Sequence, residues 1–580
     1  MSRRVRDCIT KAEHEAVSRR STSNTAKSPA PPLRIAMLGW ARLALQEREG
    51  SGYNLYVSEL ARELAQRGHL VAFLRSGIDY SLLPVTRIQP TEIWRGVACF
   101  SILNSPILST GNEHFASPET QISSPRLTAL VLDFLSTFRP HVVHVHALEG
   151  FPFDLIPAIK ASGTRVVFTP HNYFLLCPQV DMLHQVRKVC DDFEGGQRCE
   201  TCMPQRPVSR EILARKARLT ARRWLGPSIG QAAKSAKAAL RRRLRAADAW
   251  PNDPIPIREH AGESFTPHTS ISQTRPPLPH VLTPPNPNVH ERLLDGTIQL
   301  RVLNRYGTRR RAAIDALNAA DAILCPGDFL RKVHVAAGAD PAKTRHLPIG
   351  QPHFDLARRH TLDPDRDNLP RWTHDSPSPL RLAFFGSTYP HKGLATLIAA
   401  IERLDPSVLS RLTLDVHAMG DDAPFRRRLA AHAHAATAVR FLGAYDITSL
   451  IATLRAIDAC IFPNGALENS PFVVLESIAA GRFVIASRLG ASRDLLKSSE
   501  SGLLVNPADP DDLAIAITSI IQGHLTLPSP HQIRESLSIP THTEHVTAIE
   551  RIYASLLGHE SASSVEVKPL TPAPEAAVTQ

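Results

Sequence analysis

The chain has 580 residues, a length that suggests more than one domain with room for a sizeable core in each. It is 43% hydrophobic and 21% charged, as expected of a globular protein in water. No apolar run reaches the roughly 18 residues that a transmembrane helix needs. The N-terminal segment lacks the apolar core of a signal peptide, so we expect the protein to work in the cytoplasm.

The net charge is +12, and nearly all of the excess lies in one segment. Residues 205–250 carry 13 Lys and Arg against 2 Asp and Glu. A basic helical segment suits an anionic lipid surface or a nucleic acid, and an ordinary solvated helix face is the alternative. Nucleic acid is the weakest of the three, because only Trp224 and Trp250 are interleaved as aromatic residues.

Short apolar runs alternate with helical patterns after a polar segment, residues 1–32, which we expect to be a disordered arm. The first predicted strand covers 33–38, and the helix predicted at 58–69 stops at Gly68. Further strands are predicted at 70–75, 142–147, 165–172 and 322–326. Strands that alternate with helices predict a parallel sheet covered on both faces.

The pattern restarts after residues 353–380, a polar, Pro-rich stretch that we interpret as a linker. The strands predicted beyond it are 382–387, 412–418, 439–443, 459–464, 483–488 and 502–507. The predicted fold class is therefore α/β, with two Rossmann-like domains facing across a cleft. We place the first domain at 33–352 with a Cys-rich and basic insertion at about 177–310, the second at 381–558, and a disordered tail at 559–580.

The stretch ENSPFVVLESIAAG, residues 468–481, holds two carboxylates eight residues apart around a predicted helix start. Pro471 suits the first turn of a helix, and Ser470 is a reasonable N-cap. The free N–H groups of such a start can bind phosphate. A diphosphate there, with a sugar near Glu468 and a ribose near Glu476, would satisfy both acids. A capped helix with two surface acids is the alternative.

Taken in order, these segments resemble the family 4 glycosyltransferases, which are retaining enzymes of the GT-B fold. Residues 468–476 are similar to the family's E-x7-E motif, and 52–71 to its Gly-rich first loop and following helix. Further similar segments lie at 138–150, 169–178, 318–338 and 490–514, so the resemblance covers most of the chain. The chain resembles in particular a bacterial subgroup with added cysteines.

The resemblance implies a role for individual residues. Lys392, at a turn between strand and helix, would bind the donor phosphates, and Glu476 would bind the nucleotide ribose. Glu468 would contact the donor sugar next to the reacting carbon, with His171 beside the sugar, and these two are the catalytic candidates. The substrate-binding candidates also include Gly50 and Gly52 of the first loop, and Asn469, Ser470, Pro471, Phe472 and Val473.

Some positions depart from the family's pattern. Ser387 follows the strand glycine at the position where the family usually has Arg, so we count it among the substrate-binding candidates. Because Ser carries no charge, Lys392 would have to supply more of the phosphate binding. The family's G-G-x-x-E motif reads GASRD here, with Ala491 in place of the second glycine and Asp494 in place of the glutamate. The two glycines of the first loop, Gly50 and Gly52, are one residue further apart than in the family.

Four of the eight cysteines fall together: Cys177, Cys190, Cys199 and Cys202. A C-x-x-C pair with two earlier cysteines is a metal-ligand pattern, and disulfides are not expected in the cytoplasm. We favour a structural zinc site that pins the loop after His171, with an iron–sulfur cluster and free or redox-active thiols as alternatives. We expect that catalysis itself requires no cofactor, because Lys392 and helix N–H groups would stabilise the leaving phosphate.

The resemblance therefore predicts a retaining glycosyltransferase that moves a sugar from a nucleoside-diphosphate sugar to a glycan or lipid-linked acceptor in bacterial polysaccharide synthesis. Residues 205–250 would hold it as a peripheral protein at the anionic inner face of the membrane, and no nucleic acid is expected as a partner. The alternatives are a transferase of a soluble small acceptor, and a non-catalytic scaffold or regulator of the same fold, which the departure at Ser387 leaves open.

Overall fold

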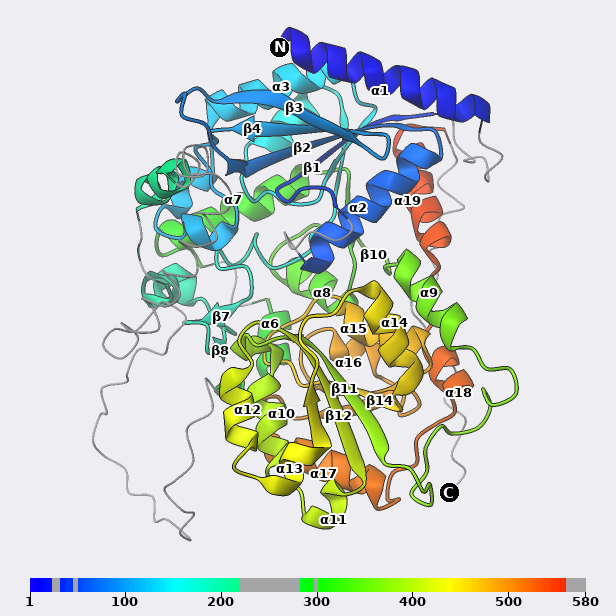
Figure 1. Cartoon of the computed structure of the whole chain (residues 1–580). Coiled ribbons are helices and arrows are strands. Elements are labelled where there is room, and N and C mark those ends of the chain that lie inside the picture. Colours follow the sequence, from blue (N-terminus) through cyan, green and yellow to red (C-terminus); the bar gives the residue numbers. More distant parts are fainter. Residues whose placement is uncertain are drawn as a thin grey trace, which may run out of the picture.

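Two α/β domains make up the structure, a computed structural model, and they lie one above the other in Figure 1. The residues it describes are 1–22, 32–44, 51–203, 205, 207–217, 282–296 and 301–559. Each domain is built on its own largely parallel sheet, so the expected pair of Rossmann-like domains is confirmed. Among these residues, no helix combines the length and the apolar character needed to cross a membrane.

The first sheet has eight strands in the order β10-β9-β6-β5-β1-β2-β4-β3. They are β1 (Arg34–Gly39), β2 (Leu70–Asp79), β3 (Arg87–Trp94), β4 (Val97–Leu103), β5 (Val142–Val145), β6 (Arg165–Phe168), β9 (Ala322–Cys325) and β10 (Thr344–His346). All neighbours pair in parallel except β3 and β4, which form an antiparallel edge. The accompanying helices are α2 (Ser51–Gln66), α3 (Pro125–Phe138), α4 (Leu155–Ala161), α7 (Arg305–Ala319) and α8 (Asp328–Ala336).

The second sheet has six parallel strands in the order β13-β12-β11-β14-β15-β16. They are β11 (Leu380–Ser387), β12 (Leu412–Met419), β13 (Val439–Phe441), β14 (Ala459–Phe462), β15 (Phe483–Ser487) and β16 (Gly502–Val505). This is the strand order of a dinucleotide-binding Rossmann domain, and it reverses between β11 and β14. Loops that leave the carboxyl ends of these two strands therefore diverge around a crevice.

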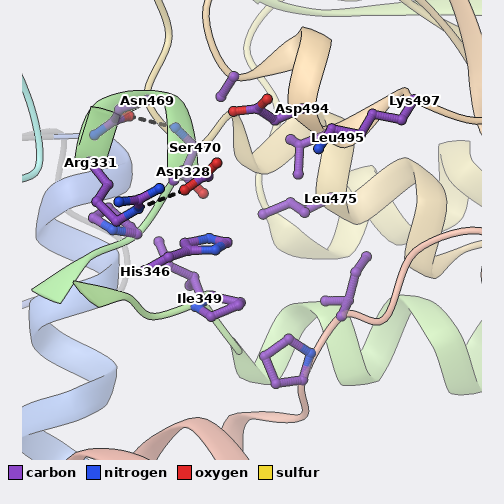
Figure 2. Close-up of a pocket in the computed structure, with 16 residues that line it drawn as sticks. Asp328, Arg331, His346, Ile349, Asn469, Ser470, Leu475, Asp494, Leu495 and Lys497 are labelled. Atoms are coloured by element: carbon purple, nitrogen blue, oxygen red, sulfur yellow. Dashed lines mark hydrogen bonds and ion pairs between the residues drawn. The ribbon is translucent and has the colours of Figure 1, made fainter. Parts of the chain in front are cut away.

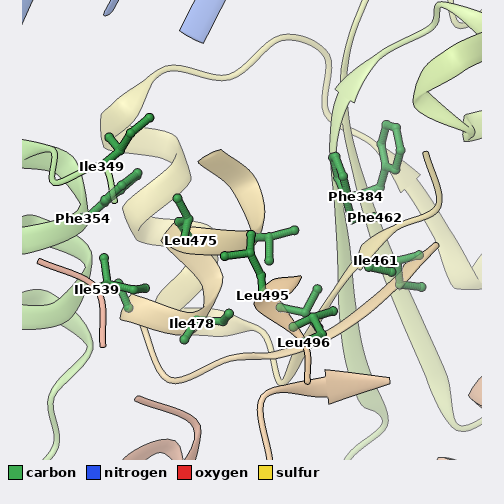
Figure 3. Close-up of a cluster of buried hydrophobic side chains, with 14 of the residues drawn as sticks. Ile349, Phe354, Phe384, Ile461, Phe462, Leu475, Ile478, Leu495, Leu496 and Ile539 are labelled. Carbon is green, nitrogen blue, oxygen red and sulfur yellow. The ribbon is translucent and has the colours of Figure 1, made fainter. Parts of the chain in front are cut away.

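Short helices connect the strands of the second domain. They are α10 (Leu394–Ile401), α11 (Pro406–Leu409), α12 (Ala423–Leu429), α13 (Ala433–Ala438), α14 (Ile447–Ala456), α15 (Phe472–Ala479), α16 (Ser492–Leu495), α17 (Pro510–Ile521) and α18 (Pro530–Glu535). Figure 3 shows the apolar core around α15, where Leu475 and Ile478 lie among Phe354, Leu495 and Ile539. The helix that carries the second glutamate of the motif is therefore anchored by its apolar face.

Residues 1–22 do not belong to the disordered arm that we expected at 1–32, of which residues 23–31 lie outside the described part of the chain. Helix α1 (Arg3–Thr22) lies along the outer edge of the first domain in Figure 1, across the end of the sheet that carries β3. Its apolar side chains recur at helical spacing and are buried: Val5, Ile9, Ala12 and Ala16. The segment looked disordered because it has few apolar residues, but most of these share one face, and Val17 is the exposed exception among the described side chains of the helix.

The chain crosses between the domains twice, and this corrects two expected boundaries. Helix α9 (Pro352–Thr361) occupies the first part of the predicted linker 353–380. Helix α19 (His542–Leu556), which we had assigned to the second domain at 381–558, packs beside α2 of the first domain. Its Glu550 lies at the centre of that contact and is fully buried.

Parts of the expected insertion at about 177–310 are described. It includes a small hairpin of β7 (Leu183–His184) and β8 (Lys188–Val189), the 3-10 helix η3 (Glu194–Thr201) and helix α6 (Val289–Leu294). Most of the basic segment 205–250, and nearly all of the tail at 559–580, lie outside the described residues. The expectations for those segments stay predictions.

Candidate active site

The crevice of the second domain brings together two residues that the sequence singled out. Strand β11 leads into the short helix η4 (Pro390–Lys392), and β14 leads through 463–471 into α15. Because these strands flank the reversal of strand order, their loops face the same crevice. Lys392 Nζ donates a hydrogen bond to Glu468 Oε1 at 2.6 Å across a sequence separation of 76 residues.

Lys392 and Glu468 form a charged pair that solvent still reaches. Burial alone would raise the pKa of Glu468, but the charge and hydrogen bond of Lys392 hold it below its ordinary value. Burial would lower the pKa of Lys392, yet Glu468 raises it above its ordinary value. The lysine and glutamate side chains remain 29% and 20% exposed. A ligand in the crevice can therefore compete for the ammonium group.

The loop that carries Glu468 is held between glycines of both domains. Gly490, which follows β15, has φ 60°, and a Cβ there would lie 2.7 Å from the Glu468 carbonyl oxygen. The carbonyl also accepts a hydrogen bond from Ala491 N at 2.9 Å. On the first domain, a Cβ at Gly327 would overlap the carbonyl oxygen of Asn469. Gly490 is the first residue of GASRD, so this part of the resemblance has a steric reason.

The start of α15 differs in detail from the expectation. Pro471 is the N-cap with no side-chain capping bond, so the predicted N-cap at Ser470 is wrong. Asn469 Oδ1 instead accepts a hydrogen bond from Ser470 N at 2.7 Å, and Asn469 Nδ2 donates to the His171 carbonyl of the first domain. Asn469 thus links the motif loop to the opposite wall of the cleft.

Glu476 lies on a part of α15 that faces another helix. Its side chain is almost buried, and its Oε1 lies 2.9 Å from Nε2 of His353 in α9. Phe472, one turn earlier, packs against the rings of His353 and Phe354. A ribose that binds Glu476 would have to share the carboxylate with His353, so the predicted ribose contact stays a prediction.

His171 follows β6 and lies in a cluster of rings on the first-domain wall. Its ring centroid lies 4.9 Å from that of Tyr56 and 5.1 Å from that of Tyr53. Its Nε2 faces His146 Nδ1 at 3.3 Å. Burial, and then the nearby His545, lower the pKa of His171 to about 3, so the ring is neutral at physiological pH. It can exchange hydrogen bonds with a hydroxyl, but it adds no positive charge.

The remaining substrate-binding candidates differ in how far they are exposed to the cleft. Gly50 lies outside the described residues, whereas Gly52 is in the first turn of α2, and a Cβ there would meet the Phe472 ring at 3.7 Å. The first loop therefore approaches the start of α15 across the cleft. Ser387 ends β11 and is largely buried, and Val473 is partly buried behind Phe472.

One residue of this region was missed by sequence reasoning. Asp181, in the loop between Cys177 and Cys190, acts electrostatically on both Lys392 and Glu468. Crowding by protein atoms raises its pKa to about 6, with Lys392 opposing that shift and Glu468 adding to it. No pattern in the sequence marks this acid, because its partners come from the other domain.

The four cysteines of the insertion lie near one another and influence each other's charge: Cys177, Cys190, Cys199 and Cys202. Burial raises the pKa of every one of these thiols. Gln185 N points at Cys202 Sγ at 3.4 Å, and Arg310 Nη2 at Cys199 Sγ at 3.9 Å. As placed, no three His, Cys, Asp or Glu side chains among the described residues form a group that could hold a metal ion, and zinc stays a prediction.

A cavity of ≈ 370 Å³ lies between the domains on the other side of the motif loop. Figure 2 shows Arg331 and His346 of the first domain on one side and Asp494 and Lys497 of the second on the other. Asn469 and Ser470 border it, but Lys392 and Glu468 do not. Asp494, the acid of the GASRD segment, thus lines this cavity, whereas Lys392 and Glu468 lie in the crevice.

Two family models match the chain, one in each domain. Residues 50–226 match the model described as Glycosyltransferase Family 4, and residues 379–523 match the model described as Glycosyl transferases group 1. The chain is 38% identical over 133 residues to a phosphatidyl-myo-inositol mannosyltransferase of Mycobacterium tuberculosis, which covers 22% of this chain and 32% of that protein. It is 32% identical over 192 residues to a D-inositol 3-phosphate glycosyltransferase of Geodermatophilus obscurus, covering 32% and 41%.

The matches thus span less than half the length of these two relatives. Among solved structures, the chain is similar to Anabaena HepE in complex with UDP, with 13% identity, a TM-score of 0.49, and coverage of 90% of this chain and 100% of that one.

Two Rossmann-like domains, with a lysine–glutamate pair in the crevice of the second, have the two-domain architecture of the GT-B class. Each domain matches a glycosyltransferase family model, the first domain that of family 4, in agreement with the expected family. The expected family and fold are confirmed, while the retaining course and the roles of single residues stay predictions.

Proposed function

We propose that the protein is a retaining glycosyltransferase that moves a sugar from a nucleoside-diphosphate sugar to a glycan or lipid-linked acceptor. The observation that carries the proposal is the Lys392–Glu468 pair, which places an accessible ammonium group and a carboxylate 2.6 Å apart at the strand-order reversal. Ligands of open α/β sheets bind at this position.

Each group has a task that fits its chemistry. Transfer breaks the bond between the anomeric carbon and the phosphate oxygen and forms one to the acceptor oxygen, so negative charge grows on the leaving diphosphate. Lys392 and the free N–H groups at the start of α15 lie where they can stabilise that charge. Glu468 faces the sugar, where a carboxylate can accept hydroxyl hydrogen bonds and favour positive charge on the ring. We assign no cofactor to the chemical step.

Nucleotide release tests this proposal. Purified protein would be incubated with UDP-, GDP-, ADP- and dTDP-sugars, with Glu468→Ala as the test variant and the exposed Glu500→Ala as a control of equal charge change. Release from one donor that Glu468→Ala abolishes and Glu500→Ala preserves would support the proposal. Neither binding nor release with any donor would refute it and favour a non-catalytic scaffold or regulator.

For the acceptor, we propose a glycan or lipid-linked molecule at the inner face of a bacterial membrane. The support is the basic composition of residues 205–250, together with the names of relatives that act on phosphatidyl-myo-inositol and inositol phosphate. Pelleting with vesicles of anionic and of neutral lipid tests membrane binding. Equal binding to both would count against it and favour a soluble small acceptor.

We also propose a structural zinc ion for the cysteine cluster. Arg309 and Arg310 are fully buried beside it, and among the described residues no carboxylate forms an ion pair with either. Arg309 donates to the carbonyls of Phe174 and Leu175, and Arg310 Nη1 lacks a partner. Two buried cations need anionic neighbours, and a zinc ion held by four thiolates carries a charge of about −2.

The cysteine side chains would have to rotate toward a common centre to take up that ion. Metal analysis of the purified protein tests this proposal, with Cys202→Ser as the variant and Cys460→Ser, a buried cysteine of the second domain, as the control. One zinc per chain, lost only in Cys202→Ser, is the expected result. A metal-free protein of full stability would refute it.

A further inference from the structure

The cavity between the domains has the size and position of a small-molecule site. Its volume of ≈ 370 Å³ lies within the range of about 300–1,000 Å³ that such sites occupy. Figure 2 shows His346 and Ile349 of the first domain on one side and Leu475 and Asp494 of the second on the other. Because both domains supply its walls, the cavity forms only where they pack together, and domain interfaces are common places for ligands.

Two polar atoms in the residues that line this cavity lack a partner. Among the described residues, neither Asp494 Oδ2 nor His346 Nε2 makes a hydrogen bond, although both atoms are buried. Buried polar atoms of folded proteins are nearly always paired, so these two require a partner that is not a protein group. The Asp494 side chain is still 20% exposed, so a molecule in the cavity can reach its carboxylate.

The charges of the lining disfavour a strongly charged ligand. Two acids and two bases line the cavity, so their formal charges balance: Asp328, Asp494, Arg331 and Lys497. Arg331 Nε donates a hydrogen bond to Asp328 Oδ1 at 2.7 Å, which leaves this pair neutral. A phosphate would be attracted by Lys497 but repelled by Asp494, and a cation would meet the reverse. Burial lowers the pKa of His346, so its ring adds no charge at physiological pH.

A neutral molecule rich in hydroxyl groups fits these features. Hydroxyls donate strong hydrogen bonds to a carboxylate, and they can also bond to a neutral imidazole nitrogen. A sugar ring has C–H faces as well, and the cavity offers apolar side chains to them: Ile349, Leu475, Leu495 and Ile539. We propose that this cavity is a second ligand site, separate from the crevice of Lys392 and Glu468, and that it takes up an uncharged saccharide, either a free sugar or one unit of a glycan.

Binding of sugars in the absence of any nucleotide tests this inference, so the outcome does not depend on the proposed function. Saturation-transfer NMR would screen glucose, mannose, galactose and N-acetylglucosamine, with maltose and maltotriose as longer glycans and glucose 6-phosphate as a charged probe. Titration would then give the affinity of each sugar that binds.

Variants on both sides of the cavity show where a sugar binds. Asp494→Ala and His346→Ala remove the two unpaired groups, one from each domain, and thermal melting would check that each variant is folded. Glu468→Ala removes a carboxylate of the crevice and leaves the cavity lining intact. Asp511→Ala is the matched control for loss of an acid, since Asp511 does not line the cavity.

We expect at least one uncharged sugar to bind the wild type, Glu468→Ala and Asp511→Ala equally. Asp494→Ala should bind it about tenfold more weakly, the order of one hydrogen bond to a charged group, and His346→Ala a few times more weakly. Tighter binding of maltotriose than of glucose would support a glycan unit as the ligand, and equal or weaker binding a free sugar.

Three results would overturn the inference. They are the absence of binding by every sugar, which would leave the cavity to water, a loss of binding in Glu468→Ala but not in the cavity variants, and tighter binding of glucose 6-phosphate than of glucose. A wild type that binds a sugar in this cavity but no nucleotide would overturn the proposed function and support this second site.

Discussion

Replacing Glu468 with Gln tests whether Lys392 is the phosphate ligand. Gln keeps the side-chain volume and removes the negative charge that now holds the ammonium group at 2.6 Å. Partly exposed ion pairs contribute up to about 1 kcal/mol, so freeing Lys392 from its partner should improve its attraction for a diphosphate by roughly fivefold. We therefore expect Glu468→Gln to bind the bare nucleoside diphosphate more tightly, although transfer is lost.

Lys392→Met should act in the opposite direction. It removes a charge-assisted contact of about 1.5–3 kcal/mol, which corresponds to a roughly 10- to 150-fold loss of nucleotide affinity. Without the ammonium group, burial would raise the pKa of Glu468 above its ordinary value. In the wild type, the lowered pKa of Glu468 adds stability that is present above the unfolded pKa and is lost as pH falls through the folded one.

Both variants would be measured by calorimetry with the bare nucleoside diphosphate at neutral pH and low salt. Asp511→Asn serves as the control, because it breaks an exposed ion pair with Arg403 that lies away from the crevice. The reasoning fails if Glu468→Gln weakens nucleotide binding, or if Lys392→Met leaves it unchanged.

The structure supports three further predictions. Glu550→Ala leaves Arg67 without its buried carboxylate, so the free energy of unfolding in urea should fall by about 3–5 kcal/mol, and an unchanged midpoint would contradict this. Gly490→Ala forces a Cβ against the Glu468 carbonyl at a positive φ, so nucleotide affinity should fall at least tenfold, while intact affinity in calorimetry would show that the loop can yield. Ile9→Asp should release α1 from the first sheet, which limited proteolysis would detect as early cleavage within residues 1–22.

Most of the parallel strands could be predicted because each is a short, continuous apolar run, although β4 and β10, which also pair in parallel, were missed. All six strands of the second sheet lie within one or two residues of their predicted positions. Strand β3 was missed because it is half exposed at the antiparallel edge and reads as the polar sequence RIQPTEIW. The place of α19 could not be predicted either, since its pattern shows an apolar face but does not show which domain that face covers.

The site could be predicted only for residues that follow strands of the same sheet. Lys392 and Glu468 follow adjacent parallel strands, so a correct strand order already places them together. The contact of Glu476 with His353 depends on how helix α9, which crosses between the domains, packs against α15, and the link from Asn469 to His171 depends on how the first domain packs against the motif loop. Such contacts join distant segments without a local pattern, and only the structure could reveal them.

The two crossovers between the domains lie against each other, and this has a testable consequence. A Cβ at Gly350 would overlap the Thr541 carbonyl oxygen and would lie 2.7 Å from its carbon and 2.8 Å from the Pro540 carbonyl oxygen. The His542 ring meets the Gly350 carbonyl at 3.3 Å, so the second crossover holds the first. Because the obstructing atoms belong to the backbone, Gly350→Ala has to push the two segments apart.

We therefore expect Gly350→Ala to alter how the domains close while each domain stays folded. Phe472 would then no longer be held next to the first loop, and nucleotide release should fall at least tenfold, with a larger radius of gyration in small-angle scattering. Gly163→Ala is the control for an added methyl group outside the crossovers, since no heavy atom would lie within 4 Å of its Cβ. An unchanged radius with full turnover would show that the crossovers accommodate a methyl group and do not govern closure.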